Sequence, residues 1–390
     1  MQGPYLDLPH KSSETDRKTA ESRLFEPMRI GNIEIKHRIV MPALSRMRAT
    51  VDHVPTDLML EYYAQRAVVP GTLIITEANI LSAEHSGYTN ATGIWRPDQI
   101  AAWRKITHEI HNKGSFMFLQ VMAMGRMADP NEAKREGFTI VGASSIPFVD
   151  GATVPKVMSV QDIKRTVQQF GQAAKNALEA GFDGIELLAG NGMLVEQFLQ
   201  DMTNQRDDDY GGSVEKRSRF AIEVLHAMVD AVGDPRRVSV RLSPWSKFLG
   251  MGMQDLVPQY SDLIRKADAM HLAYLHVTES RVKGTEDVAS SEKLDFAYQL
   301  FNGPVIVGGG YNGDLARNLV DQEYRDRNFA VSFGRHFIAN PDLVSRIKRN
   351  LPMNPYRRDY FYTLQEPKGY TDYPYADELV MLTNSVPGEA

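Results

Sequence analysis

The chain has 390 residues, of which 43% are hydrophobic and 24% are charged, and its formal net charge is -5. This balance is ordinary for a globular protein and provides no basic surface for nucleic acid. The absence of cysteine excludes disulfides, thiolate catalysis and cysteine-bound metals. Because no run of about 18 apolar residues is present, we expect neither a membrane span nor a secretory leader, and we expect a cytoplasmic protein.

The N-terminal part of the chain divides into an arm and a hairpin. Residues 1–22 are polar, with charges scattered through them, and are predicted to form a flexible arm. Apolar residues alternate on both sides of Gly31 and Asn32, which predicts a hairpin over 24–36 with a type I′ turn. In a barrel, this hairpin would cap one end. Residues 378–390 are predicted to form a C-terminal tail.

Short buried strands alternate with amphipathic helices over the rest of the chain. The segment 98–113, for example, repeats apolar residues at the helical spacing. Eight such pairs predict the α/β class and a single (β/α)8 TIM barrel over 23–377, with the hairpin as its cap and long βα loops. The strands are predicted at 37–43, 73–78, 116–121, 184–188, 238–243, 273–278, 304–310 and 329–334, and the helices at 57–68, 98–113, 160–180, 213–232, 254–270, 291–301, 313–322 and 340–349.

Glycines at the ends of the last two strands predict a phosphate site. Gly308, Gly309 and Gly310 end strand seven, and Gly334 with Arg335 ends strand eight. Glycines leave backbone N–H groups open to a ligand, and arginine binds phosphate through two parallel hydrogen bonds. The loops after strands seven and eight form the usual phosphate site of TIM barrels. We therefore expect a cofactor that carries a phosphate.

One long stretch makes a family recognisable. Residues 181–193 read GFDGIELLAGNGM, and they are followed by EQFLQD at 196–201, NQRDDDYGGS at 204–213 and FGRHFIANPDL at 333–343. These motifs resemble the Old Yellow Enzyme family of FMN-dependent ene-reductases, and the resemblance extends over about 23–377. It implies that FMN is bound, that NADPH or NADH is the hydride source, and that the substrate is a small apolar unsaturated carbonyl compound.

The resemblance also assigns cofactor contacts. It implies that the Ser45 hydroxyl donates to the flavin, that Gln120 pairs with the pyrimidine edge, and that Arg241 stabilises the reduced, anionic flavin. From the residues alone, an ordinary loop serine is the favoured interpretation of Ser45, and a buried cation paired with a carboxylate is the alternative for Arg241. The cofactor-binding residues implied are Ala43, Leu44, Ser45, Ala78, Gln120, Arg241, Gly308, Gly309, Gly310, Gly334, Arg335 and Phe361.

The chain departs from the family pattern at two positions of the strand-four loop. Leu188 stands where the family usually has a substrate-binding histidine, and Met193 stands where it usually has the tyrosine that protonates the substrate. Asn191 then remains as the donor to the substrate carbonyl. Leu188 and Met193, with Met122, would form an adaptable apolar pocket wall. Tyr88, Tyr362 or solvent would replace the missing tyrosine.

Three functions are compatible with this loop. The first is an FMN oxidoreductase that acts on a bulky, apolar unsaturated carbonyl compound; residues 242–253 and 255–259 resemble the fungal branch of the family that works in secondary metabolism. The second is redox-neutral or desaturating FMN chemistry, such as alkene isomerisation or cyclisation. The third is a non-catalytic binding protein, which would have no use for Gln120, Arg241 and Arg335 together.

Other conspicuous residues are expected to be structural. His271 and His276, around strand six, lack the carboxylates that a metal site would need, so no metal is predicted. Glu186 is expected to be a barrel-interior carboxylate paired with a cation. His336 follows Arg335 and is expected to face the flavin region. The protein is expected to be a monomer or a homodimer.

Overall fold

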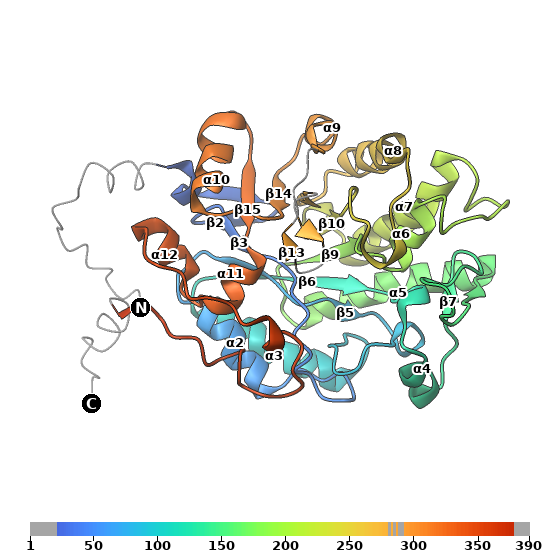
Figure 1. The fold of residues 1–390 in the computed structure, drawn as a ribbon, viewed down its shortest axis with the longest axis horizontal. Coiled ribbons are helices and arrows are strands. Elements are labelled where there is room, and N and C mark those ends of the chain that lie inside the picture. Colours follow the sequence, from blue (N-terminus) through green and yellow to red (C-terminus); the bar gives the residue numbers. More distant parts are fainter. Residues whose placement is uncertain (1–21, 280–281, 284–285, 288–291, 378–390) are drawn as a thin grey trace.

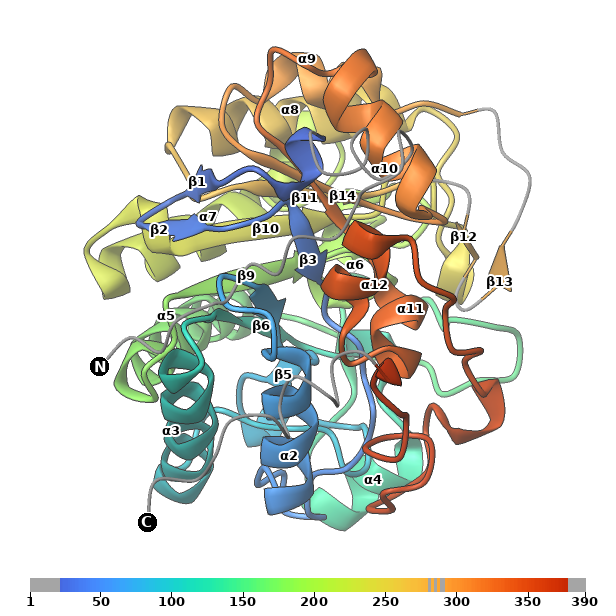
Figure 2. The same ribbon diagram turned by 90° about the vertical axis from the view of Figure 1, so that its left-hand side faces the viewer.

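The computed structural model describes residues 22–279, 282–283, 286–287 and 292–377 (Figure 1). The predicted N-terminal arm, apart from Ser22, and the predicted tail at 378–390 lie outside the described residues. In Figure 2 the strands occupy the middle of the molecule and the long helices surround them. This arrangement is that of the predicted barrel.

The barrel closes through parallel pairing alone. Among the described residues, eight strands form a ring in the order β3, β4, β6, β9, β10, β11, β14 and β15, and β15 pairs back to β3. The predicted strands are therefore confirmed, although most are shorter than the apolar runs suggested. Their bounds are β3 (Ile39–Met41), β4 (Leu73–Ile75), β6 (Phe116–Met122), β9 (Gly184–Ala189), β10 (Val238–Leu242), β11 (Leu275–Thr278), β14 (Val305–Gly308) and β15 (Phe329–Ser332).

Helices cover the outside of the ring. Eight of them, within the described part of the chain, occupy the predicted positions: α2 (Asp57–Arg66), α3 (Pro97–Asn112), α5 (Val160–Glu179), α7 (Val214–Val232), α8 (Leu256–Ala269), α9 (Asp295–Leu300), α10 (Gly313–Asn318) and α12 (Leu343–Arg349). Three short helices were not predicted: α4 (Pro130–Glu136), α6 (Leu194–Leu199) and α11 (Gly334–Ala339). The single-turn elements are η1 (Arg23–Phe25), η2 (Ala83–His85), η3 (Gly125–Met127), η4 (Pro235–Arg237), η5 (Phe248–Gly250), η6 (Leu319–Glu323) and η7 (Arg358–Tyr360), and the short strands are β5 (Asn79–Ile80), β7 (Val141–Gly142), β8 (Lys156–Val157), β12 (Val282–Lys283) and β13 (Glu286–Asp287).

Local capping explains where the long helices begin. The Ser159 hydroxyl accepts from the Asp162 N–H at 3.1 Å while the Asp162 carboxylate accepts from the Ser159 N–H at 3.0 Å, a capping box at the start of α5. Helix α7 begins in a similar way, because the Ser213 hydroxyl accepts from the Lys216 N–H at 3.3 Å. It ends at Gly233, whose φ of +73° is typical of a glycine after a helix.

The hairpin of β1 (Met28–Ile30) and β2 (Ile33–Ile35) is confirmed, and its apolar side chains pack with interior residues of the barrel strands, including Phe118. The predicted type I′ turn was wrong. That turn requires positive φ at both central residues, whereas Gly31 has a φ of +53° and Asn32 has no positive φ, which is the pattern of a type II′ turn.

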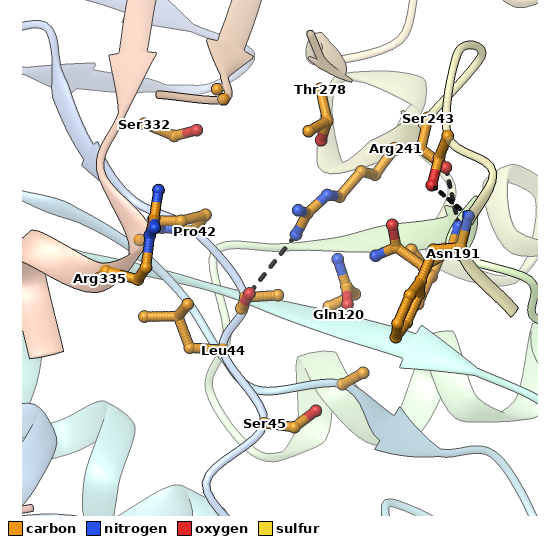
Figure 3. A pocket seen from close by; sticks show the side chains of 18 of the residues that line it. Pro42, Leu44, Ser45, Gln120, Asn191, Arg241, Ser243, Thr278, Ser332 and Arg335 are labelled. Atoms are coloured by element: carbon orange, nitrogen blue, oxygen red, sulfur yellow. Dashed lines mark hydrogen bonds between the residues drawn. The ribbon is translucent and has the colours of Figure 1, made fainter. Parts of the chain in front are cut away.

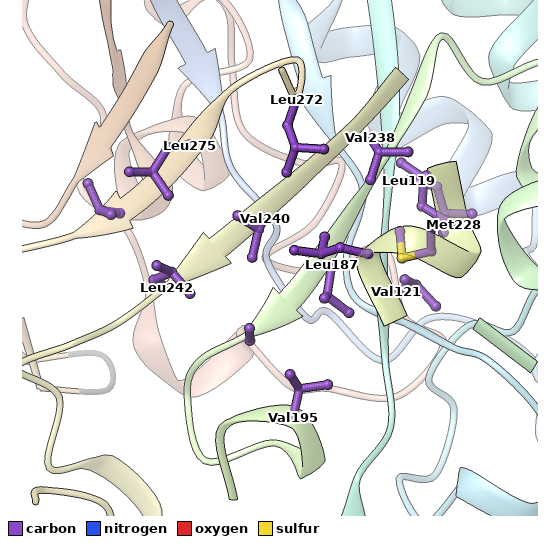
Figure 4. Packing of buried hydrophobic residues seen from close by; sticks show 14 of the residues in the cluster. Leu119, Val121, Leu187, Val195, Met228, Val238, Val240, Leu242, Leu272 and Leu275 are labelled. Carbon is purple, nitrogen blue, oxygen red and sulfur yellow. The ribbon is translucent and has the colours of Figure 1, made fainter. Parts of the chain in front are cut away.

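Strand β9 separates two environments by alternation. Ile185, Leu187 and Ala189 belong to the large core between the ring and the helices, where Leu187 lies with Val240 of β10 and Met228 of α7 (Figure 4). Glu186 and Leu188 therefore face the barrel interior, since successive side chains of a strand point to opposite faces. This alternation places the polar side chain of β9, Glu186, inside the barrel.

The described residues include neither a membrane-spanning helix nor a metal-binding cluster. None of the helices there has the length and apolar character needed to cross a membrane. No group of three or more histidine, aspartate or glutamate side chains in that part of the chain is arranged to hold a metal ion.

Candidate active site

A cavity of about 680 Å³ lies at the C-terminal ends of the barrel strands. Its wall is formed by strand ends and by the loops that follow them, as in other TIM barrels. Every site residue predicted from the sequence lines this cavity, namely Ala43, Leu44, Ser45, Ala78, Tyr88, Gln120, Met122, Leu188, Asn191, Met193, Arg241, Gly308, Gly309, Gly310, Gly334, Arg335, Phe361 and Tyr362.

One side of the cavity is a backbone surface suited to phosphate. Gly309 and Gly310 have φ values of +111° and +71°, a conformation that glycine adopts without strain. A Cβ at Gly309 would lie 3.0 Å from the carbonyl oxygen of Glu279, so a side chain there would crowd the loop. Arg335 lies across the cavity from Arg241 (Figure 3) and has its guanidinium over the ring of Tyr356. A phosphate would find open backbone and a fixed cation here.

The opposite side holds Gln120 and Arg241, which are both labelled in Figure 3. The Gln120 amide nitrogen donates to a carboxylate oxygen of Glu186 at 2.6 Å, because the strand register places these two residues side by side. His276 Nδ1 donates to the other Glu186 oxygen at 2.8 Å. Glu186 is therefore a buried carboxylate, as expected; its hydrogen-bond partners are Gln120 and His276, and the cation expected beside it is Arg241, whose charge acts on Glu186 without a direct hydrogen bond between the described side chains. His276 is a core residue, as expected.

Charge states follow from these contacts. Burial alone would raise the pKa of Glu186, but His276, Arg241 and Gln120 together hold its pKa below the ordinary value. Burial lowers the pKa of His276, so the imidazole is neutral and its Nδ1 carries the proton that Glu186 accepts. Burial also lowers the pKa of Arg241, yet an arginine remains charged at neutral pH. The wall thus presents one fixed cation to the cavity, backed by a carboxylate.

Two buried polar atoms in this wall have no hydrogen-bond partner among the described residues. Within the described part of the chain, neither Nε of Arg241 nor the hydroxyl of Thr278 has a hydrogen-bond partner. Buried donors without partners are costly, by about 1–3 kcal/mol each, unless a bound molecule satisfies them. Unpartnered donors on β10 and β11, with Gln120 on β6, a glycine cradle and Arg335 opposite, fit the carbonyl-rich ring and the phosphate of a flavin mononucleotide.

The remaining wall is apolar. Leu188, Met122 and Met193 pack in one cluster with Met124 and with partly buried Tyr88. Methionine adapts its shape readily, so this wall can accept a bulky apolar molecule. Leu188 and Met193 offer neither a hydrogen bond nor a proton to that molecule.

Asn191 lies on a tight loop between β9 and α6. Its φ of +55° is left-handed, and its backbone N–H donates to the Ser243 hydroxyl at 2.8 Å. Figure 3 shows the Asn191 side chain on the same side of the cavity as Arg241 and Gln120. The amide is therefore available to a carbonyl oxygen of a molecule bound beside the flavin site.

Tyr88 and Tyr362 supply hydroxyl groups on the apolar side. Burial raises the pKa of Tyr88, and the neighbouring Tyr362 raises it further. Burial also raises the pKa of Tyr362, with Arg46 opposing it, although the side chain remains 49% exposed. Both phenols therefore keep their protons at neutral pH and can exchange them with water.

Buried arginines place the wall that carries Phe361. Arg46 Nε donates to the Phe361 carbonyl at 3.1 Å and its Nη2 to the Gly369 carbonyl at 2.7 Å. Arg48 Nη1 donates to the same Phe361 carbonyl at 3.0 Å. These contacts join the strand-one loop to the C-terminal segment, so Phe361 is held at the cavity independently of any ligand.

Several lining residues were not singled out from the sequence. Thr278 and Ser332 are the last residues of β11 and β15, so their positions at strand ends could have marked them. His336 lines the cavity, in agreement with its expected place near the flavin region. Other lining residues that were not singled out lie on loops or single-turn elements whose positions depend on tertiary contacts, including Ser243, Phe248, Leu249 and Tyr356.

Fold and site together define a flavin-dependent oxidoreductase built on a (β/α)8 barrel. Residues 23–354 match the NADH:flavin oxidoreductase / NADH oxidase family, and the chain belongs to that family. Its cofactor is FMN, its hydride source is a reduced nicotinamide, NADPH or NADH, and it is an enzyme of the ene-reductase type, as expected from the resemblance.

Three similar proteins come from fungi. The chain is 45% identical to the NADP-dependent oxidoreductase lnbE of Aspergillus flavus, over 93% of this chain and 98% of the relative. It is 45% identical to the chanoclavine-I aldehyde reductase fgaOx3 of Penicillium roqueforti, over 92% and 97%. A protein of Epichloe festucae var. lolii named probable inactive reductase easA is 42% identical, over 92% and 97%. These relatives place the chain in the fungal secondary-metabolism branch of the Old Yellow Enzymes.

Solved structures agree. The Old Yellow Enzyme from Pichia sp. AKU4542 superposes with a TM-score of 0.85 at 34% identity, covering 92% of this chain and 95% of that one. Morphinone reductase gives a TM-score of 0.83 at 34% identity, covering 92% and 98%.

Proposed function

We propose that this enzyme reduces the carbon–carbon double bond of a bulky, apolar α,β-unsaturated aldehyde or ketone. The observation that supports this proposal best is the composition of the cavity wall. A methionine-rich surface built from Met122, Met193 and Leu188 lies beside the flavin site, and Asn191 supplies a carbonyl donor. We also propose that 23–377 acts as a single FMN-binding unit.

The chain's own groups would prepare the reaction in three ways. FMN, once reduced by NADPH, supplies a hydride to an electrophilic carbon. Arg241 offsets the negative charge at the reduced ring, and Gln120 orients that ring. Gly308 to Gly310 and Arg335 hold the phosphate. The apolar wall excludes water from the reacting carbon, which strengthens every polar contact inside.

Asn191 would polarise the substrate carbonyl. Its amide N–H groups can donate to the oxygen, on which negative charge grows as the hydride arrives. A single donor of this kind contributes about two to three orders of magnitude in rate, or roughly 3 kcal/mol. Because Leu188 contributes no second donor, we expect weaker activation of simple enones and greater dependence on apolar binding energy.

Protonation of the product carbon would come from Tyr88, from Tyr362 or from solvent. Both tyrosines line the cavity with raised pKa values, so each holds a proton that it can donate. The exposure of Tyr362 allows reprotonation from water.

The proposed substrate class follows from the wall and from the relatives' names. One relative is named for reduction of chanoclavine-I aldehyde, which supports a bulky polycyclic aldehyde as the kind of molecule accepted here. The test is a series of unsaturated aldehydes of increasing apolar size, assayed with NADPH by product mass. The proposal expects kcat/KM to rise at least tenfold from crotonaldehyde to a two-ring enal; equal values across the series would contradict it.

A second function is favoured by Met193 alone. Because a thioether neither gives nor takes a proton, a hydride placed on the substrate can return, which yields alkene isomerisation instead of reduction. In that case the substrate would be converted with no net consumption of NADPH. The measured ratio of NADPH oxidised to product formed separates this function, at a ratio near zero, from reduction, at a ratio near one.

A further inference from the structure

A buried carboxyl group lies directly behind the loop that carries Asn191. Glu196, in α6, is fully buried. Its Oε2 accepts from the Gly192 N–H at 2.6 Å. Its Oε1 accepts from the Tyr260 hydroxyl at 2.7 Å, from the Gln200 amide at 3.3 Å and from the Ser243 hydroxyl at 3.5 Å. None of these partners, all of them described residues, carries a positive charge.

The contacts of Glu196 converge on the loop from several elements. Gly192 lies in the loop itself, Tyr260 comes from α8, and Ser243 follows β10. Ser243 is shared, because its oxygen also accepts from the Asn191 N–H at 2.8 Å. The network therefore accepts hydrogen bonds from two consecutive backbone N–H groups, those of Asn191 and Gly192.

The backbone conformation of this loop depends on such hydrogen bonds. Asn191 and Gly192 have φ values of +55° and +80°, two left-handed residues in succession. Asparagine enters this region only at some cost, so the conformation persists where surrounding contacts impose it. A Cβ at Gly192 would meet Leu249 Cβ at 2.8 Å, so the neighbouring loop already packs against it. The Gln197 amide holds the Gly192 carbonyl at 2.8 Å from the other side.

We propose that Glu196 is a positioning residue: through Gly192 and Ser243 it holds the loop in the left-handed conformation that presents the Asn191 amide to the substrate carbonyl. The kinetic part of this inference rests on the proposed function of Asn191; the conformational part does not.

The ionised form of Glu196 suits this role. Four donors point at its two oxygens, and a carboxylate can accept all of them. A protonated carboxyl or an amide places a hydrogen against one of these donors, so at least one contact is weakened. Burial raises the pKa of Glu196 to about 7, against the opposing effect of Gly192, Tyr260, Ser243 and Gln200. Tyr260 is the one titratable group among these partners, and burial raises its pKa well above the ordinary value.

The direct test is hydrogen–deuterium exchange of peptides that cover 189–193, measured on the FMN-loaded protein and corrected for intrinsic rates. Glu196→Gln should raise exchange there about tenfold. Glu77→Gln, at another fully buried carboxyl that makes no contact with this loop, should leave it unchanged. In the parent, protection should fall as pH decreases through about 7. Exchange within twofold of the parent in Glu196→Gln would overturn the inference.

Kinetics supply the second readout. With cyclohex-2-enone, Glu196→Gln should lower kcat/KM about tenfold at unchanged FMN content, and in an Asn191→Ala background it should have no further effect, because it acts through Asn191. Additive losses would overturn the kinetic part. If the parent reduces no enone, the proposed function is wrong. The exchange experiment still tests whether Glu196 holds the loop in its conformation. Should Glu196→Gln not fold, Tyr260→Phe removes one donor and should shift the pH midpoint of loop protection upward; an unchanged midpoint would count against the inference.

Discussion

The side-chain nitrogen of Gln120 lies 2.6 Å from a Glu186 carboxylate oxygen, and this contact determines which way the amide faces. An ionised carboxylate accepts and does not donate, so the amide nitrogen must point to it. The amide oxygen and the second N–H then remain for the flavin ring. Because the Glu186 carboxylate is buried, the positive charge of Arg241 helps to keep it ionised.

Arg241→Ala should weaken flavin binding by about tenfold or more, roughly 1.4 kcal/mol, and slow its reduction by NADPH. The variant loses the cation at the ring and leaves Glu186 without its positive neighbour. Flavin content and stopped-flow reduction rates measure both effects. Arg241→Lys is the charge-preserving control, and adding Glu186→Gln to Arg241→Ala should recover part of the loss. Unchanged flavin content and an unchanged reduction rate would contradict the role of Arg241 in flavin binding.

Leu188→His combined with Met193→Tyr should increase reduction of cyclohex-2-enone. The histidine adds a second donor to the carbonyl, and the tyrosine adds a proton source, each a contribution of about two orders of magnitude in a site built for it. Steady-state kinetics with NADPH measure the change. A double variant that binds FMN yet reduces this enone no faster than the parent would show that the rest of the loop no longer supports that geometry.

Tyr88→Phe or Tyr362→Phe should slow product formation by about two orders of magnitude or more at whichever tyrosine donates the proton. Phenylalanine keeps the ring and removes only the hydroxyl, so each variant controls for the other. Formation of the saturated product from a bulky enal, measured by rapid quench and product mass, reports the step. If the double variant retains the parent rate, the proton comes from solvent.

Glu77 should make stability depend on pH. Burial raises its pKa to about 7, although Arg46 and Arg48 oppose this. Because the pKa of Glu77 in the folded state lies above its ordinary value, protonation of Glu77 favours the folded state. This contribution to the free energy of unfolding is fully present below about pH 4.5 and is lost as pH rises through 7. Glu77→Gln should therefore gain stability relative to the parent between pH 5 and pH 8, by roughly 3 kcal/mol at most. Urea midpoints with saturating FMN measure this difference, and an equal difference at both pH values would contradict it.

Most of the barrel could be predicted because each strand is buried on both faces and each long helix carries an apolar stripe. The short helices could not. Helix α11 begins at Gly334, where strand eight was predicted to end, and its six residues are too few to show an apolar stripe. Helix α6 is buried along its whole length and shows no stripe either. The hairpin turn was assigned type I′ from its glycine and asparagine, but their order, with glycine at the first central position, is the pattern of a type II′ turn.

The lining of the cavity could be predicted from strand ends and family motifs, which lie in the chain as contiguous letters. Its support could not. The hydrogen bond between Glu196 and Tyr260 joins residues 64 positions apart, and the carbonyls that Arg46 holds are more than 300 positions away. Such pairings exist only once the barrel has closed.

The central claim is that FMN in this site passes electrons from NADPH to an apolar unsaturated carbonyl compound despite Leu188 and Met193. The most direct measurement is anaerobic: add NADPH to the FMN-loaded protein, follow the loss of flavin absorbance, and then add a two-ring enal. We expect the absorbance to bleach and then to return as the saturated product forms. A bound flavin that NADPH does not bleach, or that the enal does not reoxidise, would contradict the claim.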